Sequence, residues 1–226
     1  MTSGLAGLIV AALAFVGSHV LLSGPLRPAL VRALGERGFI GAYSLVALAT
    51  FAAMVFAFMR TEPQMPLWNG MAMGPWLAAS LLTIVALALF LGSLKGNPAL
   101  PEAPVAGLAT RPVTGAFRIT RHPMMMGFAL WAVAHIVVAP TPRTIVVAMA
   151  ILVLALIGSD QQDRRKLRTL GTEWQGWMER TSFWPRWSEL GALGLTWIVA
   201  LLVWLAATWA HMPAAGIAAG AWRWLT

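Results

Sequence analysis

Six stretches of this chain contain no Asp, Glu, Lys or Arg and are almost wholly apolar. They cover residues 4–22, 39–59, 76–94, 124–139, 144–159 and 190–210. A helix that crosses a bilayer needs about 17–25 apolar residues, because the hydrocarbon offers no partner for an open backbone. Four stretches reach that length. The sequence therefore predicts an all-α protein, a polytopic transmembrane bundle of about six spans that forms one transmembrane domain over residues 1–226.

The two shorter stretches are the fourth and the fifth, and they have 16 residues each. The turn Pro140-Thr-Pro-Arg143 joins them, so we expect a helical hairpin. We expect its first helix to begin upstream of the apolar stretch, near Arg118.

The composition excludes several classes of protein. Charged residues make up 11% of the chain and hydrophobic residues 59%, whereas a soluble domain carries about a quarter charged residues. Disordered chains and nucleic-acid-binding domains are polar and strongly charged. We therefore expect a lipid bilayer as the main partner and no nucleic acid. The absence of cysteine excludes disulfides and thiolate metal sites.

The positive charges predict the topology. Of the 16 Lys and Arg residues, 13 lie in the segments 23–38, 95–123 and 160–189, and three lie elsewhere. Loops rich in Lys and Arg stay on the cytoplasmic side. We therefore expect these three segments to be cytoplasmic and both termini to be periplasmic.

Two histidines lie within the predicted spans, His19 in the first and His135 deep in the fourth. An imidazole in hydrocarbon is costly unless it binds something, so each marks a functional hypothesis. One interpretation is that both are axial ligands of a haem iron, for which neutral imidazole is a good ligand. The other interpretation is an interhelical hydrogen bond to a hydroxyl or a backbone carbonyl.

The predicted depths of the two histidines differ. His19 lies near the cytoplasmic end of its span, whereas His135 lies 13 residues beyond His122, roughly 20 Å along an ideal helix. A tilted porphyrin, or a deeply seated turn at His122, would reconcile the two heights. His122 is therefore an alternative ligand.

The motif Arg121-His122-Pro123 predicts a helix start, because proline at the first helical position needs no N–H partner. Free N–H groups at such a start favour an anion, and Arg118 lies three residues before Arg121. A phosphate, a carboxylate or a haem propionate is one predicted occupant. The alternative is a cluster of positive charges in contact with lipid headgroups.

Asp160 and Asp163 follow the fifth span at a spacing that places them on one helix face. Such a pair is suited to acid–base work or to a metal, but two ligands are too few to define a metal site. Salt bridges to the arginines that follow are the favoured interpretation.

Four stretches near these residues share a pattern with a known family. They are Gly17-Ser-His19-Val-Leu-Leu-Ser23-Gly24-Pro-Leu-Arg27, Gly35-Glu36-Arg37-Gly38-Phe39, Arg121-His122-Pro123 with Gly127-Phe128, Leu130-Trp131-Ala132 and Ala134-His135, and Asp163-Arg164-Arg165. The chain thereby resembles the NnrU proteins, bacterial membrane proteins named for a link to nitrite and nitric oxide reduction. That family is similar to plant zeta-carotene isomerase, a haem b enzyme that isomerises a double bond in a polyene.

The resemblance implies a bacterial inner membrane location and haem b as the cofactor. It places the ligands at His19 and His135, and it implies either a role in denitrification or cis-trans isomerisation of a lipophilic polyene. The plant enzyme is thought to exchange a histidine ligand for a cysteine. This chain has no cysteine, so that exchange is excluded here.

A second pattern resembles the isoprenylcysteine and phospholipid membrane methyltransferases. It comprises Gly115-Ala-Phe117, Arg121-His122-Pro123, Gly127, Gly171-Thr-Glu173-Trp174, Arg180 and Pro185. In those enzymes the Arg-His-Pro turn helps to bind S-adenosylmethionine, so this resemblance implies cofactor binding at Arg121 and His122. The chain departs from that pattern at Met124, where an aromatic residue is usual, and at Asp160 and Asp163, where glutamates are usual.

Three hypotheses for the function follow. The chain is a haem protein that works with a lipophilic molecule or a redox partner, or a methyltransferase, or a non-enzymatic assembly or regulatory factor. The sequence indicates neither the substrate nor the oligomeric state.

Overall fold

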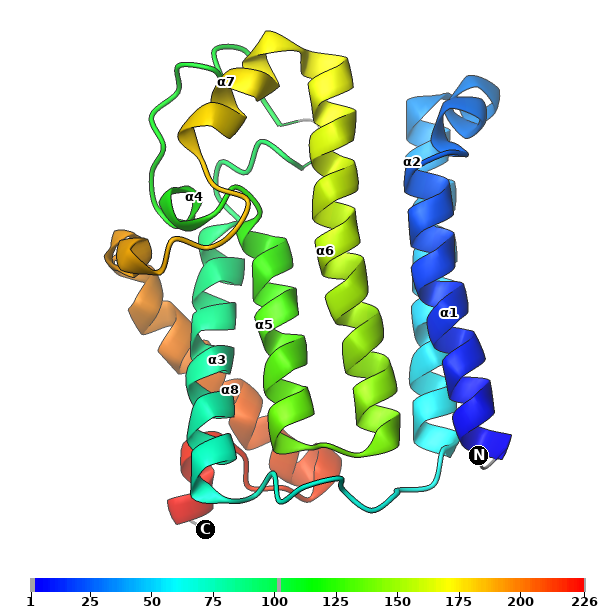
Figure 1. Cartoon of the computed structure of the whole chain (residues 1–226), viewed down its shortest axis with the longest axis vertical. Coiled ribbons are helices and arrows are strands. Elements are labelled where there is room, and N and C mark those ends of the chain that lie inside the picture. The colour runs from blue at the N-terminus through cyan, green and yellow to red at the C-terminus, as the bar shows by residue number, and fades with distance from the viewer. Residues whose placement is uncertain (1–2, 101–102, 226) are drawn as a thin grey trace.

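The computed structural model describes residues 3–100 and 103–225, which form helices and connecting loops without a strand. Five helices are long and apolar enough to cross a membrane. They are α1 (Ser3–Ser23), α2 (Arg27–Arg60), α3 (Met73–Gly92), α6 (Pro142–Leu170) and α8 (Thr196–Ala215). A shorter apolar helix, α5 (Pro123–Val138), packs against both α3 and α6 (Figure 1). The predicted all-α polytopic bundle is confirmed.

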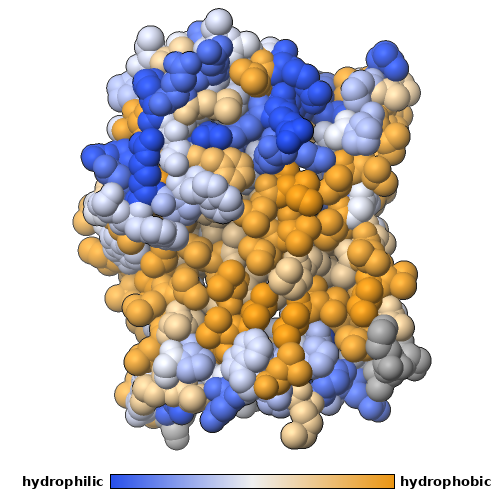
Figure 2. All heavy atoms as spheres, in the orientation of Figure 1, coloured by the Kyte–Doolittle hydropathy of each residue, from blue (hydrophilic) through white to orange (hydrophobic). Residues whose placement is uncertain are grey.

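Successive long helices run in opposite directions, so both termini lie at the same end of the bundle (Figure 1). The opposite end, which we name the basic end, carries the short helices α4 (Ala116–Ile119) and α7 (Thr172–Arg180). Figure 2 shows a broad hydrophobic band around the middle, with hydrophilic residues gathered at the basic end. This arrangement suits a bilayer, and the cytoplasmic location of the basic end stays a prediction from its charges.

The helix that follows the long crossing begins later than predicted. We expected it to begin near Arg118, but α4 is a separate turn, and the chain is extended at Thr120 before α5 begins at Pro123. A proline disfavours helical conformation in the residue before it and fits the first helical position. Arg121 and His122 therefore lie in a turn ahead of α5.

Helix α6 is longer than the apolar stretch that predicted it. The stretch ends at residue 159, but no Gly or Pro interrupts the following residues until Gly171, which has a φ of 54°. The helix therefore continues beyond the apolar stretch to Leu170. Asp160 and Asp163 lie on this continued part of the helix, as their spacing predicted.

The second and last spans also differ at their boundaries. Helix α2 begins at Arg27 and is broken at Gly35, whose φ of 71° and ψ of 169° are non-helical, so its apolar part follows the break. A 3₁₀ helix, η1 (Trp187–Leu193), precedes α8, which continues past residue 210 to Ala215. A second 3₁₀ helix, η2 (Gly220–Trp224), folds back and packs against α3 and α8.

Two groups of helices form the core. Leu8, Ala12 and Phe15 of α1 pack with α2 and with Ala150 of α6. On the other side α3 packs against α5 and α8. The α3–α5 contact is close, because a Cβ atom on Gly127 would lie 2.7 Å from the carbonyl oxygen of Ala86. Small residues of this kind let membrane helices approach one another.

Candidate functional site

A buried ion cluster joins the start of α5 to α6 at the basic end. The Arg121 guanidinium donates to the Asp163 carboxylate, with Nη2 2.6 Å and Nε 2.7 Å from Oδ2. Nε2 of His122 lies 3.0 Å from Oδ1 of the same carboxylate, and the indole of Trp174 lies 3.3 Å from that oxygen. The Arg121 and Asp163 side chains are only 9% and 8% exposed. The cluster therefore places a charged pair in the interior, with each charge bonded.

The same cluster accounts for both residues predicted to bind a cofactor at the Arg-His-Pro turn. Nδ1 of His122 lies 3.3 Å from Oε1 of Gln162, so both ring nitrogens face α6. The guanidinium of Arg121 also stacks over the ring of Phe183. Neither Arg121 nor His122 lines either of the two cavities described below. Their contacts suit a structural lock between α5 and α6.

We expected both aspartates to form salt bridges with the arginines that follow them, and in the described part of the chain only Asp160 does so. Asp160 pairs with Arg164 one turn further along α6, at 2.8 Å and at the surface. Asp163 pairs instead with Arg121, 42 residues earlier in the chain. Among the described residues no three His, Cys, Asp or Glu side chains gather closely enough to hold a metal ion.

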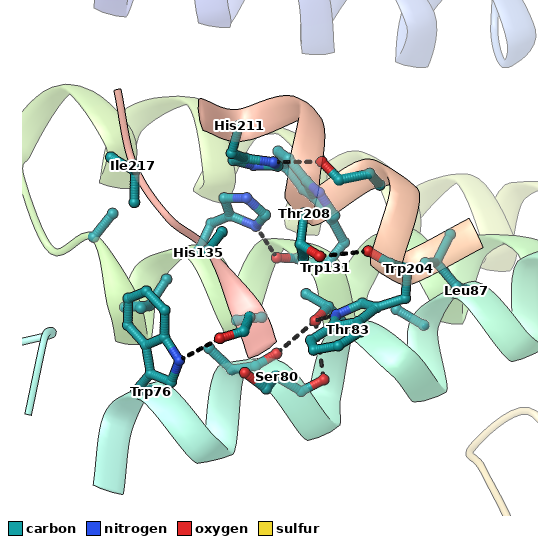
Figure 3. A pocket seen from close by; sticks show the side chains of 18 of the residues that line it. Trp76, Ser80, Thr83, Leu87, Trp131, His135, Trp204, Thr208, His211 and Ile217 are labelled. Carbon is teal, nitrogen blue, oxygen red and sulfur yellow. Dashed lines mark hydrogen bonds between the residues drawn. The ribbon is translucent and has the colours of Figure 1, made fainter. Parts of the chain in front are cut away.

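The first cavity, which we name the His135 cavity, lies among α3, α5, α8 and η2 and has a volume of about 390 Å³. Its walls are strongly aromatic, with side chains of Trp76, Phe90, Phe128, Trp131 and Trp204. Figure 3 shows His135 of α5 and His211 of α8 within this lining. The last uncharged stretch ends at residue 210, but α8 continues to Ala215 and brings His211 to the same cavity as His135.

Hydrogen bonds hold the frame of the His135 cavity in place. The indole of Trp204 donates to Oγ1 of Thr83 at 2.9 Å, which links α8 to α3. The indole of Trp76 donates to the carbonyl oxygen of Gly220 at 3.1 Å, which links α3 to η2 (Figure 3). The polar groups around the cavity are thus used in holding helices together, and the two imidazoles are the titratable groups that line it.

Three imidazoles share one local arrangement. Nδ1 of His19, His135 and His211 lies 2.7, 2.8 and 2.7 Å from the backbone carbonyl oxygen four residues earlier. A carbonyl only accepts, so Nδ1 carries the proton in each ring. Nε2 then keeps its lone pair, which is the tautomer that binds a metal through Nε2.

The second cavity, which we name the His19 cavity, lies among α1, α2, α5 and α6 and has a volume of about 620 Å³. Its apolar lining includes Phe15, Phe51, Ile151 and Leu154. His19 packs edge-on against the ring of Phe15, at 4.5 Å between centroids. Its polar lining residues are Ser23, Tyr43, Gln161, Gln162 and Arg165.

The structure does not bring His19 and His135 to one cavity. Each lines its own, and the side chains of Phe128 and Trp131 line both. The ring of Trp131 stacks on that of His135 at 4.0 Å between centroids. His135 thus shares a cavity with His211, whereas His19 lines a different cavity on the other side of Phe128 and Trp131.

Of the site residues that the sequence analysis did not name, His211 was detectable from the sequence, and Tyr43 and Arg165 were not. No charged residue occurs between residue 190 and Arg223, so a helix that continues past residue 210 to include His211 was predictable. Tyr43 and Arg165 carried no such signal, because their shared cavity depends on how α2 meets α6.

Comparison with known proteins identifies the family. Residues 7–219 match the family described as NnrU protein. The chain belongs to the NnrU family. It is also 33% identical over 72 residues to the 15-cis-zeta-carotene isomerase, chloroplastic, of Zea mays, a match that covers 32% of this chain and 20% of that enzyme. No solved structure matches the chain.

Proposed function

We propose that this NnrU protein binds haem b within the membrane through His135 and acts on a lipophilic polyene. The observation that carries the proposal is the His135 cavity, where an imidazole with a free Nε2 faces an apolar, aromatic space. A haem iron takes four ligands from its porphyrin and needs only one or two from the protein. A site without three clustered protein ligands therefore fits a haem better than a bare metal ion.

The residues that line the His135 cavity fit a porphyrin. Trp76, Trp131 and Trp204 supply flat apolar faces, and the cavity shows almost no polar side chain apart from hydroxyls and the imidazoles. His211 lines the same cavity, so we assign it as the second residue that would hold the iron. Haem b bound there would supply a redox-active iron in a water-poor environment.

The protein's own residues hold the ligands in position. The carbonyl oxygens of Trp131 and Ala207 fix the Nδ1 protons of His135 and His211. The stacked Trp131 ring limits rotation of the His135 imidazole. A carbonyl oxygen bonded to Nδ1 and a ring stacked on the imidazole set the tautomer and the orientation of a histidine ligand.

The lipophilic substrate is assigned to the His19 cavity. This cavity shares the Phe128 and Trp131 wall with the His135 cavity, so a molecule there lies beside the cofactor site. The maize relative is named for a 15-cis-zeta-carotene, a polyene, which supports this class of substrate. The methyltransferase hypothesis is not favoured, because Arg121 and His122 are bonded to Asp163 and line neither cavity. The link to nitrite and nitric oxide reduction stays a prediction.

Absorption and electron paramagnetic resonance spectra of single variants test the ligand assignment. The His135→Ala protein is expected to lose its haem signal, and the His211→Ala protein to change from a six-coordinate to a five-coordinate spectrum. The matched variant His19→Ala is expected to keep the wild-type spectrum. If His19→Ala changes the ligation and His211→Ala does not, the pair implied by the resemblance is correct and the His211 assignment is wrong.

A turnover assay tests the proposed reaction. Wild-type protein in liposomes loaded with a 15-cis carotene is expected to shift the isomer ratio, measured by chromatography, and His135→Ala is expected to abolish the shift. Haem-loaded wild-type protein that leaves the ratio at its uncatalysed value would contradict the isomerase proposal.

A further inference from the structure

The polar end of the His19 cavity contains a cation without a partner. Arg165 of α6 lines the cavity and is partly buried. Within the described residues its guanidinium makes neither a hydrogen bond nor an ion pair, in contrast to the neighbouring Arg164, which pairs with Asp160. A partly buried cation is costly unless it is bonded. An anionic ligand bonded to Arg165 would remove this cost.

The groups around Arg165 strengthen that requirement. Arg27 and Arg168 are cations close enough to act on it electrostatically, and the nearby acid, Glu36, forms an ion pair with Arg27. Tyr43 lines the same cavity as Arg165, and within the described residues its hydroxyl makes no hydrogen bond. The cavity end thus presents a guanidinium and a free hydroxyl, both able to donate to an anion.

The other polar residues at this end are already bonded to the protein. Ser23 Oγ lies 2.6 Å from the backbone oxygen of His19 and 2.9 Å from Oε1 of Gln161, and its single proton is used between them. Gln162 donates to the backbone oxygen of Ala99 at 3.3 Å. These residues shape the cavity end, and they leave Arg165 and Tyr43 for a ligand.

The rest of the cavity suits an apolar chain. Phe51 of α2 and Phe128 of α5 line it and are 42% and 41% exposed. Both rings lie on apolar helices, Phe51 on α2 and Phe128 on α5. A volume of about 620 Å³ lies within the range of small-molecule sites, about 300–1,000 Å³. The apolar lining thus suits a hydrocarbon chain whose polar end lies next to Arg165.

We propose that the His19 cavity binds a single-chain amphiphile with an anionic head, a carboxylate or a phosphate, which Arg165 and Tyr43 hold by charge-assisted hydrogen bonds. The inference goes beyond the proposed function, since it assigns to this cavity an anionic amphiphile that would compete with the neutral polyene for the apolar lining. It does not rest on that function, because binding needs no haem.

Quenching of tryptophan fluorescence tests the binding. Wild-type protein in phosphatidylcholine nanodiscs is titrated with dibromostearate, dibromostearyl phosphate and the neutral dibromostearyl alcohol, whose bromines quench Trp131 at the cavity wall. The Trp131→Phe protein reports the fraction of quenching that comes from this site. We expect an anionic probe to bind, and loss of its charge or the variant Arg165→Gln to weaken binding about 10- to 100-fold.

Matched variants separate this site from its surroundings. Arg164→Gln, on the same helix but outside the cavity lining and paired with Asp160 at the surface, is expected to leave the affinity unchanged, and Arg165→Lys to retain most of it. The affinities of dibromostearate and dibromostearyl phosphate are compared to show whether the cavity prefers a carboxylate or a phosphate head group. Equal binding of the alcohol, or an unchanged affinity in Arg165→Gln, would overturn the proposal.

The haem content of the same variants distinguishes the two proposals. Arg165→Gln is expected to keep the wild-type Soret absorbance. If it loses haem, Arg165 anchors a haem propionate, and the amphiphile assignment is wrong. If the wild type is colourless but binds the anionic probe, the haem proposal fails while the amphiphile site stands.

Discussion

The buried cluster at the start of α5 makes a quantitative prediction about stability. Asp163→Asn removes the charge that pairs with Arg121 while keeping the size of the side chain. The Arg121 guanidinium, only 9% exposed, is then left as an uncompensated buried charge. Breaking a buried ion pair on one side costs about 3–5 kcal/mol. For a chain of this length such a loss lowers Tm by roughly 6–20 °C.

The same helix supplies the control. Asp160→Asn breaks the ion pair with Arg164. The side chain of Asp160 is 48% exposed and that of Arg164 is 74% exposed, and exposed pairs contribute about 0–1 kcal/mol to stability. Thermal unfolding in mild detergent, followed by tryptophan fluorescence, is expected to separate the two variants clearly. Equal shifts, or an unchanged Tm in Asp163→Asn, would refute the role of the cluster as a lock between α5 and α6.

Two further predictions concern packing and topology. Gly127→Ala is expected to destabilise the protein by about 1–3 kcal/mol, because its Cβ meets the facing backbone of α3. Gly41→Ala, with nothing within 4 Å of its Cβ, is expected to be neutral or slightly stabilising in the same unfolding assay. In this cysteine-free chain, a single Cys at Met65 is expected to react with an impermeant maleimide on intact spheroplasts. A single Cys at Arg164 is expected to react only after permeabilisation, and the reverse labelling would invert the predicted topology.

The helices were predictable because the bilayer imposes a strict rule on sequence. Hydrocarbon demands long apolar runs with satisfied backbones, so the six uncharged stretches indicated the six principal helices. The same rule does not predict where a helix ends once its residues are charged and lie outside the hydrocarbon. The continuation of α6 over charged residues to Leu170 therefore escaped the prediction, whereas α8 continues to Ala215 over uncharged residues and was predictable.

The site was predictable as residue types but not as partners. Apolar surroundings drew attention to His19 and His135, and the structure gives each a cavity. Which histidines line the same cavity depends on how α8 crosses α3 and α5. The hydropathy of the sequence carries no information on that crossing. The pairing of Asp163 with Arg121, 42 residues away, has the same origin.

The central claim is that this NnrU protein carries haem b, and a pyridine haemochrome measurement tests it most directly. Wild-type protein is purified in mild detergent from haem-replete cells, and its haem is measured against its protein concentration. The account predicts a b-type haemochrome near one haem per chain, with His135→Ala almost devoid of it. A folded, monodisperse wild-type protein without haem would contradict the account.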